Sequence, residues 1–258
     1  VLAENGMCAT SHPLAAQAAL EILKNGGNAM DAAIAGAVLL GICEPQMTGI
    51  GGDCFVLFSP AGSDEIKSMN GSGTAPSSAN ADNLRAQGLT SIPLNSPHAV
   101  TIPGAVDAFC KLSNDWGKLG IDTILQPAIH YAEHGVPIAE RVSFDLAELT
   151  DNLNPSGREF YLPWGRAPKV GELFSHIGQV KVLKDIARRG RDGFYTGEVA
   201  EDMVNSLQKL GGLHTIGDFT DMEAFYTDPI SGSFSKFELF EHPPNGQGAT
   251  AILLANIL

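Results

Sequence analysis

The chain has 258 residues, of which 44% are hydrophobic and 17% charged, and its formal net charge is −13. This acidic balance excludes nucleic acid and anionic membrane surfaces as expected partners, because both require basic patches. No run of residues reaches the roughly 18 apolar positions that a membrane span needs. The length allows one large domain or two small ones.

The four cysteines do not form a metal-binding or redox motif. Cys8, Cys43, Cys54 and Cys110 lie among small or apolar neighbours, and no two of them are spaced as Cys-x-x-Cys. We expect buried thiols, with a disulfide or a metal as the alternative. Val1 is not a start methionine, so the lack of a signal peptide does not define the compartment. The cytoplasm is the preferred expectation over the periplasm or secretion.

Two helices are expected near the start of the chain. Ser11 can cap the first helix, Pro13 suits its first turn, and Gly26-Gly27 ends it. Asn28 can cap a second helix over about residues 29–42, which is apolar nearly all round and is therefore expected to be buried on every side. It is too short for a membrane span and contains Asp31.

A β-hairpin is predicted next. The glycine-rich segment 49–53 leads into an apolar strand over 54–58, a turn covers 59–63, and residues 66–69 return as the second strand. Residues 70–76 read as a loop, because they contain two glycines and end in a proline.

We predict that most of the remaining chain is helical. Residues 152–171 read as a surface excursion, 230–240 as one strand, and 243–248 as a rigid turn. Helices are expected at 104–114, 121–134, 180–188, 199–210, 219–225 and 249–258. The last helix is apolar and lacks a capping signal, so we expect the polypeptide to continue or the helix to dock against further material. The order of elements favours a layered α/β fold over a doubly wound sheet.

Two motifs suggest a cofactor or a metal, and both are weak. The glycine-rich segment 49–53 follows a helix and opens a strand, whereas a phosphate-binding loop follows a strand and opens a helix. His130 and His134 share one helix face, but no third metal ligand is identifiable. We therefore expect no cofactor and no metal.

Two serines suggest a nucleophile. Ser96 precedes His98, and Ser72 lies between two glycines. Neither has the strand-to-helix turn of a serine nucleophile. The loop around Ser72 is better suited to presenting backbone N–H groups and a hydroxyl to an anionic or amide substrate.

Several segments together resemble one family, the γ-glutamyltransferases and related amidases of the N-terminal-nucleophile hydrolases. The resemblance follows chain order over nearly the whole sequence. Its segments are Asn25–Ala33, Glu44–Gln46 with Gly49–Phe55, Ile102–Val106, Gln126–Ala128, Phe194–Gly197, Gly211–Leu213 with Asp218, and Pro243–Gly248.

The resemblance implies a four-layer αββα fold and a precursor that cleaves itself into a large and a small chain. Residues 1–258 would be an incomplete large-chain portion of a single such domain. The partner would be the small chain, whose N-terminal threonine is both nucleophile and base. This chain would then hold no catalytic residue, the substrate would be a small-molecule amide, and a homodimer of such heterodimers is allowed.

The loop after the hairpin departs from the γ-glutamyl enzymes of this family. Their pattern, Asp-x-Arg-x-x-Ala-Pro, places an arginine that binds the α-carboxylate of the glutamyl group. Counting back from Ala75-Pro76 puts Ser72 at the arginine position, with Asn70, Gly71 and Gly73 as its neighbours. We expect these four residues, 70–73, to bind substrate.

The departure at Ser72 favours an amidohydrolase or acylase that is not a strict γ-glutamyl enzyme. A true γ-glutamyltransferase that anchors the carboxylate otherwise is the first alternative. A non-catalytic scaffold derived from such an enzyme is the second.

Overall fold

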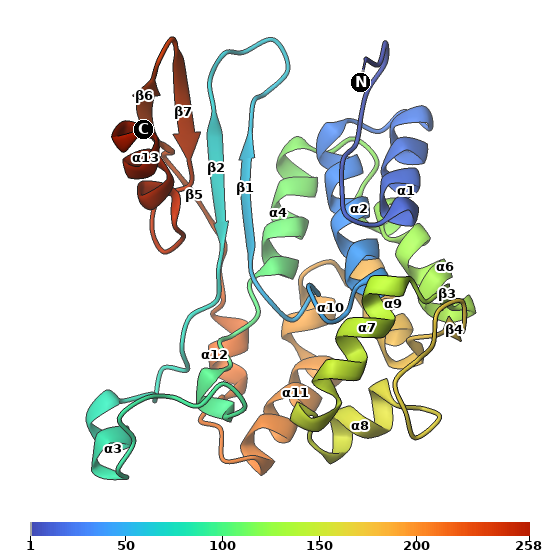
Figure 1. Ribbon diagram of the computed structural model, residues 1–258, viewed down its shortest axis with the longest axis vertical. Helices are drawn as coiled ribbons and strands as arrows, with labels where there is room; N and C mark the ends of the chain where they lie inside the picture. Colours follow the sequence, from blue (N-terminus) through green and yellow to red (C-terminus); the bar gives the residue numbers. More distant parts are fainter. Residues whose placement is uncertain (1) are drawn as a thin grey trace.

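The computed structural model describes residues 2–258 (Figure 1). The α-helices are α1 (Pro13–Lys24), α2 (Ala29–Cys43), α3 (Ala81–Ala86), α4 (Ala105–Trp116), α5 (Ile121–Ile124), α6 (Gln126–His134), α7 (Glu140–Leu149), α8 (Pro155–Tyr161), α9 (Ile177–Arg189), α10 (Asp192–Tyr195), α11 (Gly197–Lys209), α12 (Ile216–Thr220) and α13 (Gly248–Ile257). The strands are β1 (Cys54–Phe58), β2 (Lys67–Gly71), β3 (Val136–Pro137), β4 (Leu173–Phe174), β5 (Phe225–Thr227), β6 (Ile230–Phe234) and β7 (Phe237–Glu241), and short 3-10 turns cover Pro97–Ala99 and Thr150–Asn152.

The first two helices form where they were expected, with one change at the start of α1. The side chain of His12, rather than that of Ser11, caps α1 by accepting from the Leu14 N–H at 3.3 Å. Ser11 instead donates to Glu44 at 2.6 Å, which ties the start of α1 to the end of α2.

Helix α2 lies at the centre of the hydrophobic core. Asn28 and Asp31 form a reciprocal capping box at its N-terminus, which satisfies two otherwise unpaired N–H groups. Ile34, Val38 and Leu39 are at most 2% exposed. The prediction that α2 is buried on every side is wrong, however, because Ala33 and Ala37 are exposed in this chain.

A three-stranded antiparallel sheet of order β1-β2-β5 lies against the helices. The β1–β2 register runs from Cys54 opposite Gly71 to Phe58 opposite Lys67. Met69 of β2 is completely buried among helix side chains, whereas Phe55 on the opposite face of β1 is 42% exposed. Helices α4, α2 and α1 all lie on one side of the sheet (Figure 1), with α4 next to the strands and α1 packed against α2, which confirms a layered α/β arrangement.

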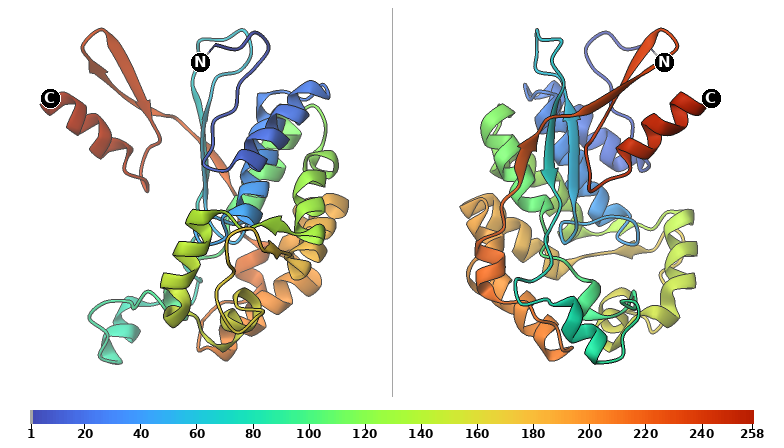
Figure 2. Two further views of the ribbon diagram at one scale, coloured as in Figure 1. Left: turned by 45° about the vertical axis from the view of Figure 1, so that its right-hand side comes forward. Right: turned by 90° about the vertical axis from the view of Figure 1, so that its left-hand side faces the viewer.

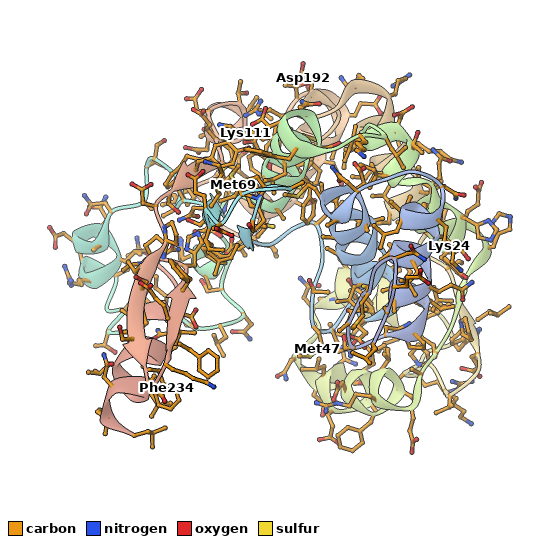
Figure 3. All side chains as sticks on the ribbon, turned by 90° about the horizontal axis from the view of Figure 1, so that it is seen from above. Lys24, Met47, Met69, Lys111, Asp192 and Phe234 are labelled. Carbon is orange, nitrogen blue, oxygen red and sulfur yellow. The ribbon has the colours of Figure 1, made fainter. Side chains whose placement is uncertain are left out.

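The hairpin β6–β7 and helix α13 form a separate unit on the other side of the sheet (Figure 2). Viewed from above, Phe234 of this unit and Met47 of the helical layer lie on opposite sides of β2, where Met69 is located (Figure 3). The β1–β2 hairpin therefore stands between the two groups of elements.

Several predicted elements need correction. Residues 219–225 are not a helix, because α12 ends at Thr220 and β5 begins at Phe225. Residues 230–240 are two strands, since Ser235 turns the chain with a φ of 55°. The helix predicted over 121–134 is divided into α5 and α6, and the excursion over 152–171 contains α8. Strand β2 continues to Gly71, so Asn70 and Gly71 belong to the sheet rather than to the loop.

All four cysteines are free thiols; Cys43 and Cys110 are buried as expected, whereas Cys8 and Cys54 are only partly buried. Burial raises the pKa of the Cys43, Cys54 and Cys110 thiols to about 12. Among residues 2–258, no helix is both long enough and apolar enough to cross a membrane.

Candidate functional site

The four predicted binding residues lie at the carboxyl end of β2, where Asn70, Asn245 and the hydroxyl and backbone N–H of Ser72 form a closed ring of hydrogen bonds. Asn70 accepts from the Ser72 N–H at 2.8 Å and donates through Nδ2 to Oδ1 of Asn245 at 3.2 Å. Asn245 in turn donates from Nδ2 to the Ser72 hydroxyl oxygen at 2.7 Å. Asn245 belongs to the loop between β7 and α13, so the ring joins the two sides of the molecule.

The two glycines beside Ser72 are required by packing. A Cβ atom on Gly73 would lie 1.6 Å from the carbonyl oxygen of Ile102, and one on Gly71 would lie 2.6 Å from the Cβ of Ala108. The strand end and the segment 102–104 therefore approach backbone to backbone. A Cβ on Gly104 would in turn lie 2.3 Å from the Gly71 carbonyl oxygen.

The segment 102–104 is itself held by hydrogen bonds to both neighbouring loops. The Ile102 N–H donates to the Thr74 carbonyl at 2.9 Å, and the Gly104 and Ala105 N–H groups donate to the Gly52 carbonyl at 3.1 and 3.0 Å. The last glycine of the segment 49–53 thus caps α4 through its carbonyl. These contacts fix where the chain around Ser72 can lie.

A partly buried ion pair supports the same segment. Asp107 of α4 is paired with Arg191 at 2.5 Å and accepts from the Ala224 N–H at 2.7 Å. The Tyr195 hydroxyl donates to the Pro103 carbonyl at 2.7 Å and accepts from the Asp107 N–H. Burial raises the pKa of Tyr195, so this hydroxyl keeps its proton and remains a donor at neutral pH.

The surroundings of Ser72 are neutral or acidic. Asp53 accepts from the Gly73 N–H at 3.0 Å, so one carboxylate lies within one residue of Ser72. In residues 2–258, no arginine or lysine side chain forms a hydrogen bond or an ion pair with Asn70, Ser72, Gly73 or Asn245. The backbone N–H groups of Ser72 and Gly73 are both used within the protein, which leaves the hydroxyl as the group that can face a ligand.

A second carboxylate fixes the loop that follows Ser72. Asp218 of α12 accepts from the Ser77 N–H at 2.8 Å and from the N–H and hydroxyl of Thr215, both at 2.8 Å. Burial alone would raise the pKa of Asp218, but these hydrogen bonds outweigh it and lower the pKa to about 2. The loop is therefore tied to α12 over the whole neutral range of pH.

His242 attaches the β6–β7 unit to the sheet. Its ring lies edge-on to Phe55 with centroids 5.0 Å apart, and Nε2 lies 3.1 Å from the Met69 carbonyl oxygen. It is 8% exposed and lies three residues before Asn245. Asn245 is therefore brought to Ser72 by an anchored strand end.

Asn245 and Asp53 are the two members of this site that sequence reasoning did not identify. Both lie in segments that carried the family resemblance, Pro243–Gly248 and Gly49–Phe55. The convergence of these two segments with residues 70–73 was not predictable from spacing, because Asn245 is 173 residues away from Ser72.

The other candidate motifs lie apart from the ring. His130 and His134 stack on α6 with ring centroids 4.4 Å apart, and residues 2–258 contain no cluster of three His, Cys, Asp or Glu that could hold a metal ion. Ser96 accepts from the His98 N–H within a 3-10 turn. The glycine segment 49–52 lines a cavity of about 770 Å³, together with residues of α8, α9 and α11.

Comparison with known proteins assigns the chain to a family. The family model described as gamma-glutamyltranspeptidase matches residues 15–258. The glutathione hydrolase-like YwrD proenzyme of Bacillus subtilis is 35% identical over 100% of this chain and 49% of its own length. The oxamate amidohydrolase proenzyme of Klebsiella pneumoniae is 32% identical over 98% of this chain and 49% of its own length.

A solved structure agrees with this assignment. The cephalosporin acylase from Bacillus halodurans is 38% identical to this chain. The match covers 100% of this chain and 49% of the acylase chain, with a TM-score of 0.95. The chain spans about half the length of the curated relatives that it matches. The fold is the α/β fold of the N-terminal-nucleophile hydrolases, with this chain contributing a helix-rich part. The chain belongs to the gamma-glutamyltranspeptidase family.

Proposed function

We propose that this chain is the large-chain portion of a self-processing amide hydrolase or acyltransferase. The relatives named above are proenzymes twice its length, which supports a partner chain cut from the same precursor. In this proposal the small chain begins with the nucleophilic threonine, and the large chain supplies the framework and the substrate loop at residues 70–73. A pair of such heterodimers and a cytoplasmic location remain predictions.

We further propose that the substrate is an amide without a strict requirement for a γ-glutamyl group. The observation that carries this proposal is the neutral ring of Asn70, Ser72 and Asn245 with the Asp53 carboxylate beside it. An α-carboxylate placed there would meet one hydroxyl rather than a guanidinium. A guanidinium can give a carboxylate two parallel charge-assisted hydrogen bonds. The hydroxyl gives only one, and one hydrogen bond to a charged group contributes about 1.5–3 kcal/mol.

Two measurements on the full-length precursor test this proposal. On a denaturing gel, two fragments are expected, and a single uncut band without amide turnover would instead support a non-catalytic scaffold. The variant Ser72→Arg should lower the KM for glutathione by about tenfold, since it restores a bidentate partner for a carboxylate, and leave the KM for 4-aminobutyryl p-nitroanilide, which has no carboxylate, the same or higher. An unchanged KM for glutathione would remove Ser72 from the substrate site.

A true γ-glutamyl enzyme is the second candidate. It is favoured by the name of the Bacillus subtilis relative, which is glutathione hydrolase-like. In that case the wild-type protein would turn over glutathione at least as well as oxamate, and Ser72→Arg would bring no gain.

A further inference from the structure

We propose that Asn245 is a positioning residue that orients the Ser72 hydroxyl as a hydrogen-bond donor towards the substrate. The inference rests on the proposed function of the loop at residues 70–73 and extends it to a residue of the β7–α13 loop. It also defines the chemical group that is recognised, namely an acceptor oxygen of a carbonyl or a carboxylate.

The polarity of the ring can be deduced from one atom whose role is fixed. The Ser72 backbone N–H can only donate, so the atom of Asn70 that it contacts at 2.8 Å must be Oδ1. The other atom of the Asn70 amide is then Nδ2, a donor, so the facing atom of Asn245 must be Oδ1. The remaining atom of Asn245 is consequently Nδ2, and it donates to the Ser72 hydroxyl oxygen at 2.7 Å.

The Ser72 hydroxyl is left with a proton that has no partner at good distance among residues 2–258. Its oxygen already accepts from Asn245, so its own proton must point elsewhere. The nearest acceptor is the Gly73 carbonyl at 3.4 Å, which is well beyond the usual 2.7–2.8 Å of a hydroxyl donor. The hydrogen bond from Asn245 Nδ2 thus leaves the Ser72 proton as the donor that can face a ligand.

The position of Asn245 is set independently of Ser72. His242 is anchored to β2 and Phe55, and a Cβ on Gly248 would lie 2.2 Å from the His242 carbonyl oxygen, so the loop between them is tightly closed. Asn245 itself is exposed, so a ligand can reach it. These features allow the loop to orient Ser72 without covering it.

The variants Asn245→Leu and Asn245→Asp alter this contact in different ways. Leucine has nearly the same shape and cannot donate, so the hydroxyl of Ser72 loses its orientation. Aspartate is also similar in shape, but its carboxylate would accept the Ser72 proton and turn it away from the substrate. Asn205→Leu is the matched control, because Asn205 is an exposed residue of α11 whose side chain forms no hydrogen bond within the described part of the chain.

The cleaved full-length wild type is first assayed with oxamate and with glutathione. The substrate that it turns over faster is then used to measure kcat and KM of all variants. Asn245→Leu and Ser72→Ala should each raise KM about 2- to 12-fold, the effect of one neutral hydrogen bond, with kcat within about twofold. The double variant should be no worse than Ser72→Ala alone, because Asn245 acts through Ser72. Asn205→Leu should change neither constant.

Additive effects in the double variant, or an unchanged KM in both Asn245 variants, would overturn the proposal. A fall in kcat alone would do the same, since it would indicate a structural effect. If Asn245→Leu does not cleave itself on a gel, Asn245→Asp carries the test. If the wild type shows no turnover, the proposed function fails separately, and calorimetric binding of oxamate is measured with the same variants. Equal binding by wild type and Asn245→Leu would then overturn the positioning role.

Discussion

The chain just after β2 lies so close to the segment 102–104 that Gly73→Ala should destabilise the protein. The added Cβ would lie 1.6 Å from the Ile102 carbonyl oxygen, so the two backbones must separate by well over an ångström. That separation breaks the bond from the Ile102 N–H to the Thr74 carbonyl and strains those from Gly104 and Ala105. Overpacking costs about 1–3 kcal/mol and each lost hydrogen bond about 0.5–1.5 kcal/mol, so we expect a loss of about 2–5 kcal/mol.

Urea unfolding of the full-length precursor, followed by circular dichroism, measures this loss. Gly51→Ala is the matched control, because no atom lies within 4 Å of the Cβ that it would add and its φ is not positive. The control should stay within about 0.5 kcal/mol of wild type, as surface substitutions usually do. Equal stability of Gly73→Ala and wild type would refute the assigned backbone contact, as would an equal loss in both variants.

Two further predictions concern the core and the loop anchored by α12. Leu39→Ala should destabilise the protein by about 2–5 kcal/mol in the same urea assay, because Leu39 is fully buried, and Leu40→Ala, at a half-buried position, should cost clearly less. The pKa of Asp218 in the folded protein is about 2, below its ordinary 3.8, so its contribution is present above pH 3.8 and is lost as the pH falls towards 2. The stability advantage of wild type over Asp218→Asn should therefore shrink between about pH 5 and pH 2, whereas Asp64→Asn, at an exposed loop position, should show no such change in thermal melts.

Local signals predicted the elements whose ends are marked by capping residues or glycines. Helix α2 begins at Asn28 because that side chain completes a capping box, and β1 is a short apolar run between turn residues. The same reasoning failed for β6 and β7. Alternating residues continue across the turn, and Ser235 adopts a positive φ without a glycine to signal it.

The error over residues 219–225 has a similar cause. Phe219 and Phe225 are both apolar, but the first is buried at the end of α12 and the second lies in β5 beside Asn70. Spacing along the chain cannot distinguish a helix from a helix end followed by an edge strand. Pairing with β2 decides it, and this pairing is a tertiary effect.

The candidate site was predictable in part. The position of Ser72 follows from counting within one short motif, and its role in binding substrate remains a prediction. The glycines at 71 and 73 have a packing role that only the distances to Ile102 and Ala108 reveal. The ring with Asn245 depends on a contact across 173 positions of sequence, which no local pattern encodes.

The central claim, that Ser72 does not anchor an α-carboxylate as an arginine does, is tested most directly by one ratio. The cleaved full-length protein would be assayed with γ-glutamyl p-nitroanilide and with 4-aminobutyryl p-nitroanilide, which differ only in the α-carboxylate. We predict kcat/KM values within about threefold of each other, because a neutral hydroxyl beside Asp53 gives little preference for an anion. A preference of about 30-fold or more for the γ-glutamyl compound, the effect expected of a guanidinium–carboxylate pair, would contradict the account.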